Sequence, residues 1–308
     1  MTSPNQPQGA LVDWATNQQP SGEELRIASE AAVEWLESHG VRVNGTRVQH
    51  LVRGLTRSDG ALDARRPIPA QTIAALWDYA ELHDLIVIHQ QLKGVRTERF
   101  IESLRRISKG PRLLEDERAD GGSIAGRNFT FELFCAARFA SLGVPVGFET
   151  EADATLHIGG ERLALECKRL GNIETLERNI EDAALQIRRR IEHGQAASGI
   201  AAVSISRAVH QVSIEQNVQP IGDVESLRKG LRQMVANWGP HFYERFSRLS
   251  PHLAGILIHY KLPLIDHKTG GATLLSRFTM YALDNKDSPP EVIARSRACF
   301  QALSQLDS

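Results

Sequence analysis

Three charged residues flank a short glycine pair in the middle of the chain. Asp153 precedes the alternating stretch ATLHI, and Glu166 and Lys168 close the stretch ERLALECK. Gly159 and Gly160 lie between the two stretches, and paired glycines are typical of a two-residue β-hairpin turn because they accept positive φ angles. A hairpin closed at these glycines places Asp153 directly opposite Glu166.

Side chains alternate between the two faces of such a hairpin. One face is apolar and is expected to meet the core: Ala154, Leu156, Ile158, Leu163, Leu165 and Cys167. The other face carries Asp153, Thr155, His157, Arg162, Ala164, Glu166 and Lys168. Like charges directly opposite each other destabilise a sheet, so something is expected to offset the repulsion between the two acids.

A divalent cation would provide that offset. Mg²⁺ binds carboxylate oxygens and completes its shell with water and phosphate oxygens. With Lys168 beside it, such an ion would polarise a phosphate and activate water for phosphodiester hydrolysis. The alternative is that Glu166 and Lys168 form an ion pair on a half-exposed strand and that Asp153 only begins the hairpin.

The same residues resemble the signature of the PD-(D/E)xK nuclease superfamily. The chain has Asp153, twelve intervening residues and then Glu166-Cys167-Lys168, although Ala152 stands where the motif has proline. The resemblance implies a restriction-endonuclease-like mixed sheet flanked by helices. It also implies a metal site at Asp153, Glu166 and Cys167 that takes Mg²⁺, with Mn²⁺ as a substitute.

Two helices beside the hairpin carry further candidates. The resemblance assigns a supporting role to Glu132, in the helix predicted at 129–142. Glu132 also borders an apolar stripe, so pairing with Arg138 or an interaction with the helix dipole is an alternative. In the helix predicted at 173–192, the resemblance also makes Gln186 a candidate to reach the site. The arginines 188–190 near its end are expected to complement the helix dipole rather than to contact DNA.

Composition limits the function classes without choosing among them. Hydrophobic residues make up 42% of the 308-residue chain and the net charge is −1, so a nucleic-acid surface would have to be local. The three cysteines have no CxxC spacing, which disfavours zinc and disulfide frameworks. No apolar run is long enough for a transmembrane helix, so we expect a cytoplasmic protein without membrane contact.

The N-terminal part of the chain is predicted to be helical. Residues 1–20 are rich in Pro, Gln and Asn and are expected to form a disordered or loosely docked tail. Residues 21–118 are expected to form a helical domain of four or five helices, beginning with one at about 22–38. Between residues 85 and 114, the sequence has seven Lys or Arg residues and only two acidic residues. This stretch is either a phosphate-binding surface or an ordinary solvated helix face.

The second domain is expected at 126–308, with an α/β fold. Its predicted order is a helix at 129–142, strands near 145–150, 153–158 and 162–168, a helix at 173–192 and a buried strand at 199–206. A further helix at 223–238, strands at 252–260 and 274–283 and a terminal helix from about 289 follow. His259 is expected to be a satisfied strand histidine rather than a ligand.

Two functions are consistent with these observations. The first is a Mg²⁺-dependent nuclease with catalytic residues Glu132, Asp153, Glu166 and Lys168, acting on nucleic acid, with DNA as the expected substrate. Restriction, repair and phage defence are the contexts that the resemblance implies, and a homodimer is an open arrangement. The second is a non-catalytic nucleic-acid-binding or assembly protein that keeps the fold.

Overall fold

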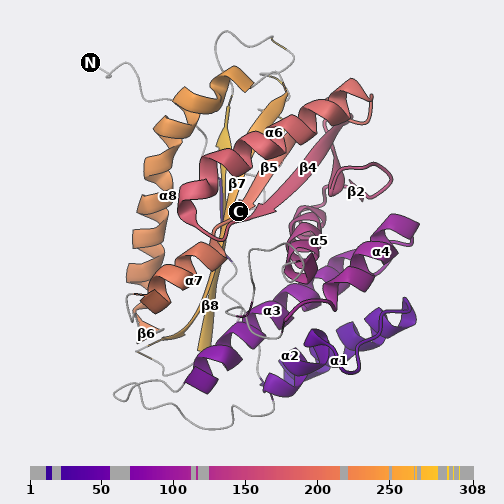
Figure 1. Cartoon of the computed structure of the whole chain (residues 1–308), viewed down its shortest axis with the longest axis vertical. Helices are drawn as coiled ribbons and strands as arrows, with labels where there is room; N and C mark the ends of the chain where they lie inside the picture. Colours follow the sequence, from indigo (N-terminus) through magenta and orange to yellow (C-terminus); the bar gives the residue numbers. More distant parts are fainter. Residues whose placement is uncertain are drawn as a thin grey trace.

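The computed structural model describes most of the chain as an α/β fold. The described residues are 12–15, 22–55, 70–111, 116, 125–215, 221–249, 252–266, 268 and 272–283, with single positions at 290, 294 and 298. Within them, a mixed sheet of eight strands is flanked by helices (Figure 1). The α/β class predicted from the sequence is therefore confirmed.

The sheet has a parallel centre and antiparallel edges. Its strands are β1 (Val12–Ala15), β2 (Val146–Gly147), β3 (Ala154–Ile158), β4 (Glu161–Arg169), β5 (Ser198–Ser204), β6 (Ile221–Gly222), β7 (Leu253–Asp266) and β8 (Ala272–Ala282). They lie in the order β1-β8-β7-β5-β4-β3-β2, and β6 pairs with β7. The pairs β4–β5, β5–β7 and β6–β7 are parallel, whereas the remaining pairs are antiparallel.

Four helices precede the first long strands. They are α1 (Gly22–Ser38), α2 (Arg47–Leu55), α3 (Ala70–Leu92) and α4 (Glu98–Ile107). Helix α1 is followed by Gly40 at a φ of 71°, the left-handed conformation that glycine accepts most readily. The side chain of Thr97 caps α4 by accepting from the backbone N of Phe100. The helical character predicted for this region is confirmed.

The remaining helices alternate with the strands. They are α5 (Ala125–Ser141), α6 (Leu176–Glu192), α7 (Ser206–Glu215) and α8 (Val224–Phe246), with short 3-10 turns at Ile173–Thr175 and Ser247–Leu249. The predicted order of helix, three strands, helix and strand is present as α5, β2, β3, β4, α6 and β5. Because β4 and β5 are parallel, α6 is the crossover that connects them.

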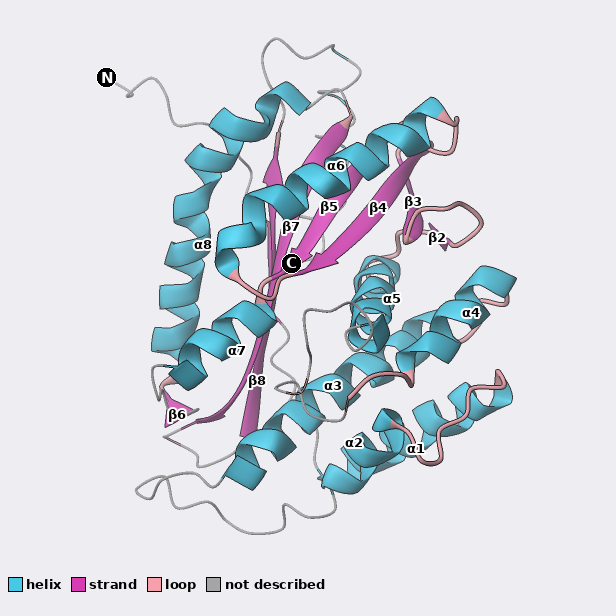
Figure 2. Ribbon diagram, in the orientation of Figure 1, coloured by secondary structure: helices cyan, strands magenta, loops and turns pink. Residues whose placement is uncertain are grey.

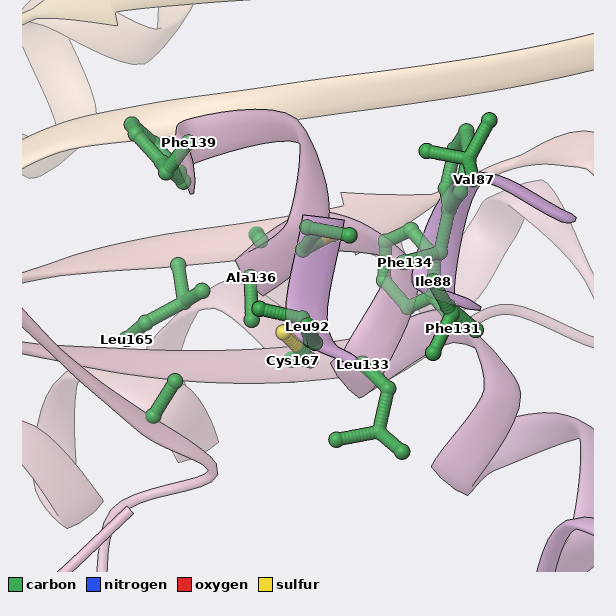
Figure 3. Close-up of a cluster of buried hydrophobic side chains, with 14 of the residues drawn as sticks. Val87, Ile88, Leu92, Phe131, Leu133, Phe134, Ala136, Phe139, Leu165 and Cys167 are labelled. Carbon is green, nitrogen blue, oxygen red and sulfur yellow. The ribbon is translucent and has the colours of Figure 1, made fainter. Parts of the chain in front are cut away.

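The two faces of the sheet have separate hydrophobic cores. Helix α5 covers the face that carries Leu163, Leu165 and Cys167, and Figure 3 shows Ala136 and Phe139 of α5 close to that strand. Helix α6 lies across β4 and β5 on the other face (Figure 2), where Ile180 and Ile187 pack with Ala164 and Val203. The hairpin therefore lies between two helices.

The N-terminal helices share the first core. Leu36, Leu51, Ile88 and Phe100, from four different helices, belong to the same buried cluster as Phe134 of α5. In Figure 3, Ile88 and Leu92 of α3 lie beside the aromatic residues of α5. The helical region and the α/β region are thus packed into one body.

Several boundaries differ from the sequence prediction. Residues 12–15, inside the predicted tail, form β1 and pair with β8, since the short alternating stretch VDWA extends an open sheet edge that composition alone does not reveal. Helix α5 begins at 125 rather than 129, and α8 continues through Pro240 to 246. Helix α7 was not predicted. The predicted terminal helix lies largely outside the described residues.

No helix in the described ranges has the length and apolar character needed to cross a bilayer.

Candidate functional site

The hairpin has the register predicted from its glycine turn. Ile158 pairs with Glu161, and the ladder continues to Ala154, which pairs with Leu165. Gly159 and Gly160 have φ angles of 61° and 81°, as a tight turn of this type requires. Asp153 lies one residue before the ladder, at the next position in register opposite Glu166.

Asp153 is fixed by the backbone of the opposite strand. Its Oδ2 atom accepts a hydrogen bond of 2.7 Å from the backbone N of Cys167. Burial raises the pKa of Asp153, while this hydrogen bond, Lys168 and Arg99 act in the opposite direction. The carboxylate is therefore held at the end of the hairpin, next to the strand that carries Glu166 and Lys168.

Glu166 is buried beneath α6 rather than lying on an open face. Its exposure is 1%, and its Oε1 atom lies 3.1 Å from Nε of Arg190 on α6. The same arginine donates to the exposed Glu151 at 2.5 Å. Burial and the negative charge of Asp153 raise the pKa of Glu166 to about 7, against the opposite influence of Arg190. Arg190 is thus part of the site, a role that the sequence did not indicate.

Lys168 is held by the helix that crosses its strand. Its Nζ donates to Oε1 of Gln186 on α6, one turn before Arg190. Gln186 was a candidate from the sequence to reach the site, and the structure places it there. Gln186 is a neutral amide, so it orients the amino group of Lys168 without adding a charge of its own.

Glu132 of α5 shares the electrostatic environment of the hairpin acids. Burial raises its pKa to about 8, and the charges of Asp153 and Glu166 add to that shift while Lys168 opposes it. The side chain is half-buried. Because α5 packs against β3 and β4 and the charges of the hairpin residues act on Glu132, this residue belongs with the other candidates rather than serving the helix dipole alone.

One residue of the basic stretch reaches this site. Arg99 of α4 donates to the backbone oxygen of Glu151 at 2.6 Å, and its positive charge opposes the rise in the pKa of both Asp153 and Glu132. Other members act elsewhere: Arg106 pairs with Glu102 and lies over the ring of Phe129, and Arg96 contacts His39. Arg112 lies outside the described residues.

The oxygen donors of the site suit a hard cation such as Mg²⁺. Within the described contacts, Asp153 uses Oδ2 and Glu166 uses Oε1, so Oδ1 and Oε2 remain for a metal. The charge of Asp153 raises the pKa of both Glu132 and Glu166, and the charge of Glu166 raises that of Glu132, so a cation among these acids would be favoured. Within the described ranges, no group of three His, Cys, Asp or Glu side chains has the geometry of a metal site. Mg²⁺ commonly completes its shell with water and phosphate oxygens.

The Cys167 thiol does not belong to that donor set. Its side chain is buried in the core on the α5 face, where it forms a hydrogen bond with Cys135. Successive strand residues point to opposite faces, so Glu166 and Lys168 face α6 instead. The predicted metal role of Cys167 can involve only its backbone atoms, one of which already contacts Asp153.

His259 has the structural role expected of it, and Arg188 forms an ion pair on α6. His259 is buried, with Nδ1 at 3.3 Å from Oγ of Ser204 and Nε2 at 3.4 Å from Oγ of Ser276, so it is a satisfied strand histidine as predicted. Arg188 pairs with Glu192 at 2.8 Å on the exposed side of α6. Of the three adjacent arginines, Arg190 is the one that contacts Glu166.

Comparison of the chain with protein-family models, with curated proteins and with solved structures found no match in any of the three.

Proposed function

We propose that the hairpin site binds Mg²⁺, or Mn²⁺ in its place, and hydrolyses phosphodiester bonds in nucleic acid, with DNA as the expected substrate. The observation that supports this most is the register of the hairpin, in which Ala154 pairs with Leu165, so that Asp153 is at the position opposite Glu166, two residues before Lys168. The proposal includes a restriction-endonuclease-like fold, because the order α5, β2–β4, α6 and β5 is the one that the PD-(D/E)xK resemblance implies.

Each side chain has a distinct task in this proposal. A bound metal supplies Lewis-acid activation of phosphate and water. Asp153 and Glu166 would hold such an ion, since each has one carboxylate oxygen that accepts no hydrogen bond in the described contacts. Lys168, oriented by Gln186, stabilises negative charge that develops on the phosphate or orients the attacking water. Glu132, with a pKa of about 8, can exchange a proton with that water near neutral pH.

The lysine provides the direct test of this function. Lys168→Ala should abolish Mg²⁺-dependent nicking of supercoiled plasmid, and EDTA should abolish nicking by the wild type. The Lys168 substitution should change the free energy of unfolding by less than about 1 kcal/mol, because the Lys168 side chain lies outside both hydrophobic cores. The matched control is Lys229→Ala, which removes an exposed lysine on α8. This variant should cleave DNA normally. Normal cleavage by the Lys168 variant would contradict the proposal.

One observation favours the non-catalytic alternative. Arg190 already neutralises Glu166, whose exposure is only 1%. A nucleic-acid-binding or assembly protein could keep this ion pair as part of its fold without a metal. In that case a nucleic-acid-binding protein would shift the migration of DNA in a gel but would not cleave it with Mg²⁺ or Mn²⁺. Neither ion would stabilise the protein.

A further inference from the structure

The two acids that contact Arg190 differ in burial. Glu166 is enclosed beneath α6, whereas the side chain of Glu151 is 63% exposed and that of Arg190, between them, is 14% exposed. Nε of Arg190 donates to Oε1 of Glu166 at 3.1 Å, and Nη1 donates to Oε2 of Glu151 at 2.5 Å. The guanidinium group therefore has one end buried against a proposed metal ligand and the other end at the surface.

The outer contact of Arg190 is easier to break than the inner one. Removing one partner from a buried ion pair leaves an unpaired charge away from water, so Arg190 and Glu166 should remain together. An ion pair with an exposed partner contributes little to stability, because that partner is well solvated when it leaves. Arg190 can thus exchange Glu151 for another anion without losing Glu166.

The backbone of Glu151 is held on both sides. Its oxygen accepts from Arg99 of α4 at 2.6 Å, and its N–H donates to Oε1 of Gln195 at 3.4 Å. The next residue, Ala152, is buried. The exchange at Arg190 therefore requires a rotation of the Glu151 side chain into solvent, while the start of the hairpin, with Asp153, keeps its position.

Arg99 and Arg190 reach this segment from opposite faces of the sheet. Helix α4 shares the hydrophobic core of α5, whereas α6 packs in the core of the other face. Both arginines contact Glu151, two residues before Asp153. An anion that replaces the Glu151 carboxylate therefore experiences two positive charges next to the proposed metal site.

We propose that Arg190 binds a backbone phosphate of the nucleic-acid substrate, and that Glu151 occupies the place of this phosphate in the absence of nucleic acid. A carboxylate and a phosphodiester both present anionic oxygens that suit the planar fork of a guanidinium group. Since Nε of Arg190 stays on Glu166, the arginine links a metal-binding acid to the substrate. Such a contact positions nucleic acid without reading its sequence. The inference rests on the proposed function.

The affinity for a short fluorescently labelled DNA duplex tests this contact, measured by anisotropy in EDTA at low salt so that binding is separated from cleavage. Glu151→Gln removes the competing charge and should tighten binding about two- to fivefold, the equivalent of one exposed ion pair. Glu149→Gln is the matched control: it makes the same change at an exposed acid two residues away, which does not pair with Arg190 in the described contacts. Its effect should be clearly smaller.

Substitution of the arginine tests the other side of the contact. Arg190→Lys keeps the charge but loses the planar fork, so it should weaken duplex binding at least about threefold. Arg188→Lys, at an exposed arginine paired with Glu192, is the matched control and should bind like the wild type. Where Arg190→Gln folds, the slope of log affinity against log salt should fall by about 0.9, the loss of one phosphate contact. A purely structural arginine would leave that slope unchanged.

The outcomes separate this contact from the proposed catalysis. If Mg²⁺-dependent nicking is absent but the Glu151 and Arg190 variants change duplex binding as expected, the phosphate contact stands and the nuclease activity is contradicted. If the wild type nicks plasmid, yet Glu151→Gln binds no more tightly than Glu149→Gln or Arg190→Lys binds like the wild type, the contact is contradicted and the nuclease activity stands. A wild type that does not bind the duplex would overturn the contact as well.

Discussion

Glu166 lies between two opposing influences. Asp153 and burial favour its protonated form, whereas Arg190 on α6 favours the carboxylate. Both Asp153 and Glu166 keep one oxygen for a further ligand within the described contacts. A divalent cation at these oxygens would reduce the repulsion that raises the pKa values, so metal affinity and protein stability should change together at this site.

Asp153→Asn separates the charge of this residue from its hydrogen bond. The asparagine oxygen can still accept from the backbone N of Cys167, so the metal-free variant should be as stable as the wild type or slightly more stable. It loses a charged ligand, so it should lose the stabilisation by metal, about 2.7 kcal/mol at a hundred times the dissociation constant. Thermal melts with and without millimolar Mn²⁺ measure both effects. If Mn²⁺ stabilises neither protein, with DNA present or absent, the metal site is contradicted.

The raised pKa values also predict how stability depends on pH. Glu132 and Glu166 have pKa values of about 8 and about 7 in the folded protein, above the value of roughly 4.3 in an unfolded chain. The folded state therefore binds more protons, and the associated stability is lost as pH rises through these values. The melting temperature of the metal-free protein should therefore fall between about pH 4.5 and pH 8 and change little above that. Glu132→Gln should flatten this slope.

Glu34→Gln is the control for that measurement, because Glu34 is exposed on α1, far along the chain from the hairpin. It should leave the slope of the wild type unchanged. A melting temperature that is independent of pH over this range, or equal slopes for both variants, would show that the two carboxyl groups are already charged in the folded state.

Among individual residues, the sequence predicted the positions of those on the hairpin itself. The glycine pair determined the register, and alternation then assigned a face to Glu166 and Lys168. The contacts of Arg190 and Arg99 could not be predicted, because they depend on how far α6 and α4 approach the hairpin. The spacing of Gln186 and Arg190, one helical turn apart, is the signal that could have identified Arg190 once Gln186 was a candidate.

Helix α6 brings its side chains to the site because it lies very close to β4 and β5. Gly199 of β5 permits this approach: a Cβ atom there would lie 2.6 Å from the backbone O of Ala164 and 2.8 Å from side-chain carbons of Ile187. Such distances are too short for real contacts. The position of α6, and with it that of Gln186 and Arg190, depends on this glycine.

Gly199→Ala should therefore destabilise the protein by about 1–3 kcal/mol, the usual cost of overpacking a core. Gly230→Ala is the matched control, because a Cβ atom there meets nothing within 4 Å in helix α8. It should stabilise the protein by up to about 1 kcal/mol, since alanine favours helix over glycine. Denaturant unfolding of both variants gives the comparison. A Gly199 variant as stable as the wild type would show that α6 can shift at little cost.

Helices and strands with a clear hydrophobic pattern in the sequence were predicted well. Elements whose position depends on tertiary contacts were not. The apolar stripe of α6 and the β-branched run of β5 identified the crossover from sequence alone. Helix α7 and strand β1 were missed. Strand β1 has four residues, and its pairing with β8 depends on an open sheet edge that the local sequence does not reveal.

For the whole molecule, the sequence suggested a helical domain beside an α/β domain. The glycine-rich segment before α5 gave that boundary, because linkers often have this composition. The packing of α3 and α4 against α5 could not be deduced from it, since apolar helix faces do not specify their partners. Lys261 of β7 illustrates the result: it pairs with Asp84 and donates to the backbone O of Ala80, both on α3.

This shared packing predicts how the chain unfolds. Glu81 of α3 is bound by Arg47 of α2 and Arg127 of α5, and breaking a buried pair of this kind costs about 3–5 kcal/mol. The helices at 22–107 should therefore unfold together with the sheet, in one cooperative transition. In differential scanning calorimetry the calorimetric and van't Hoff enthalpies should agree. Glu81→Gln should lower the single melting temperature without splitting the transition, whereas Glu34→Gln should leave it unchanged. Two separate transitions in the wild type would instead support independent helical and α/β domains.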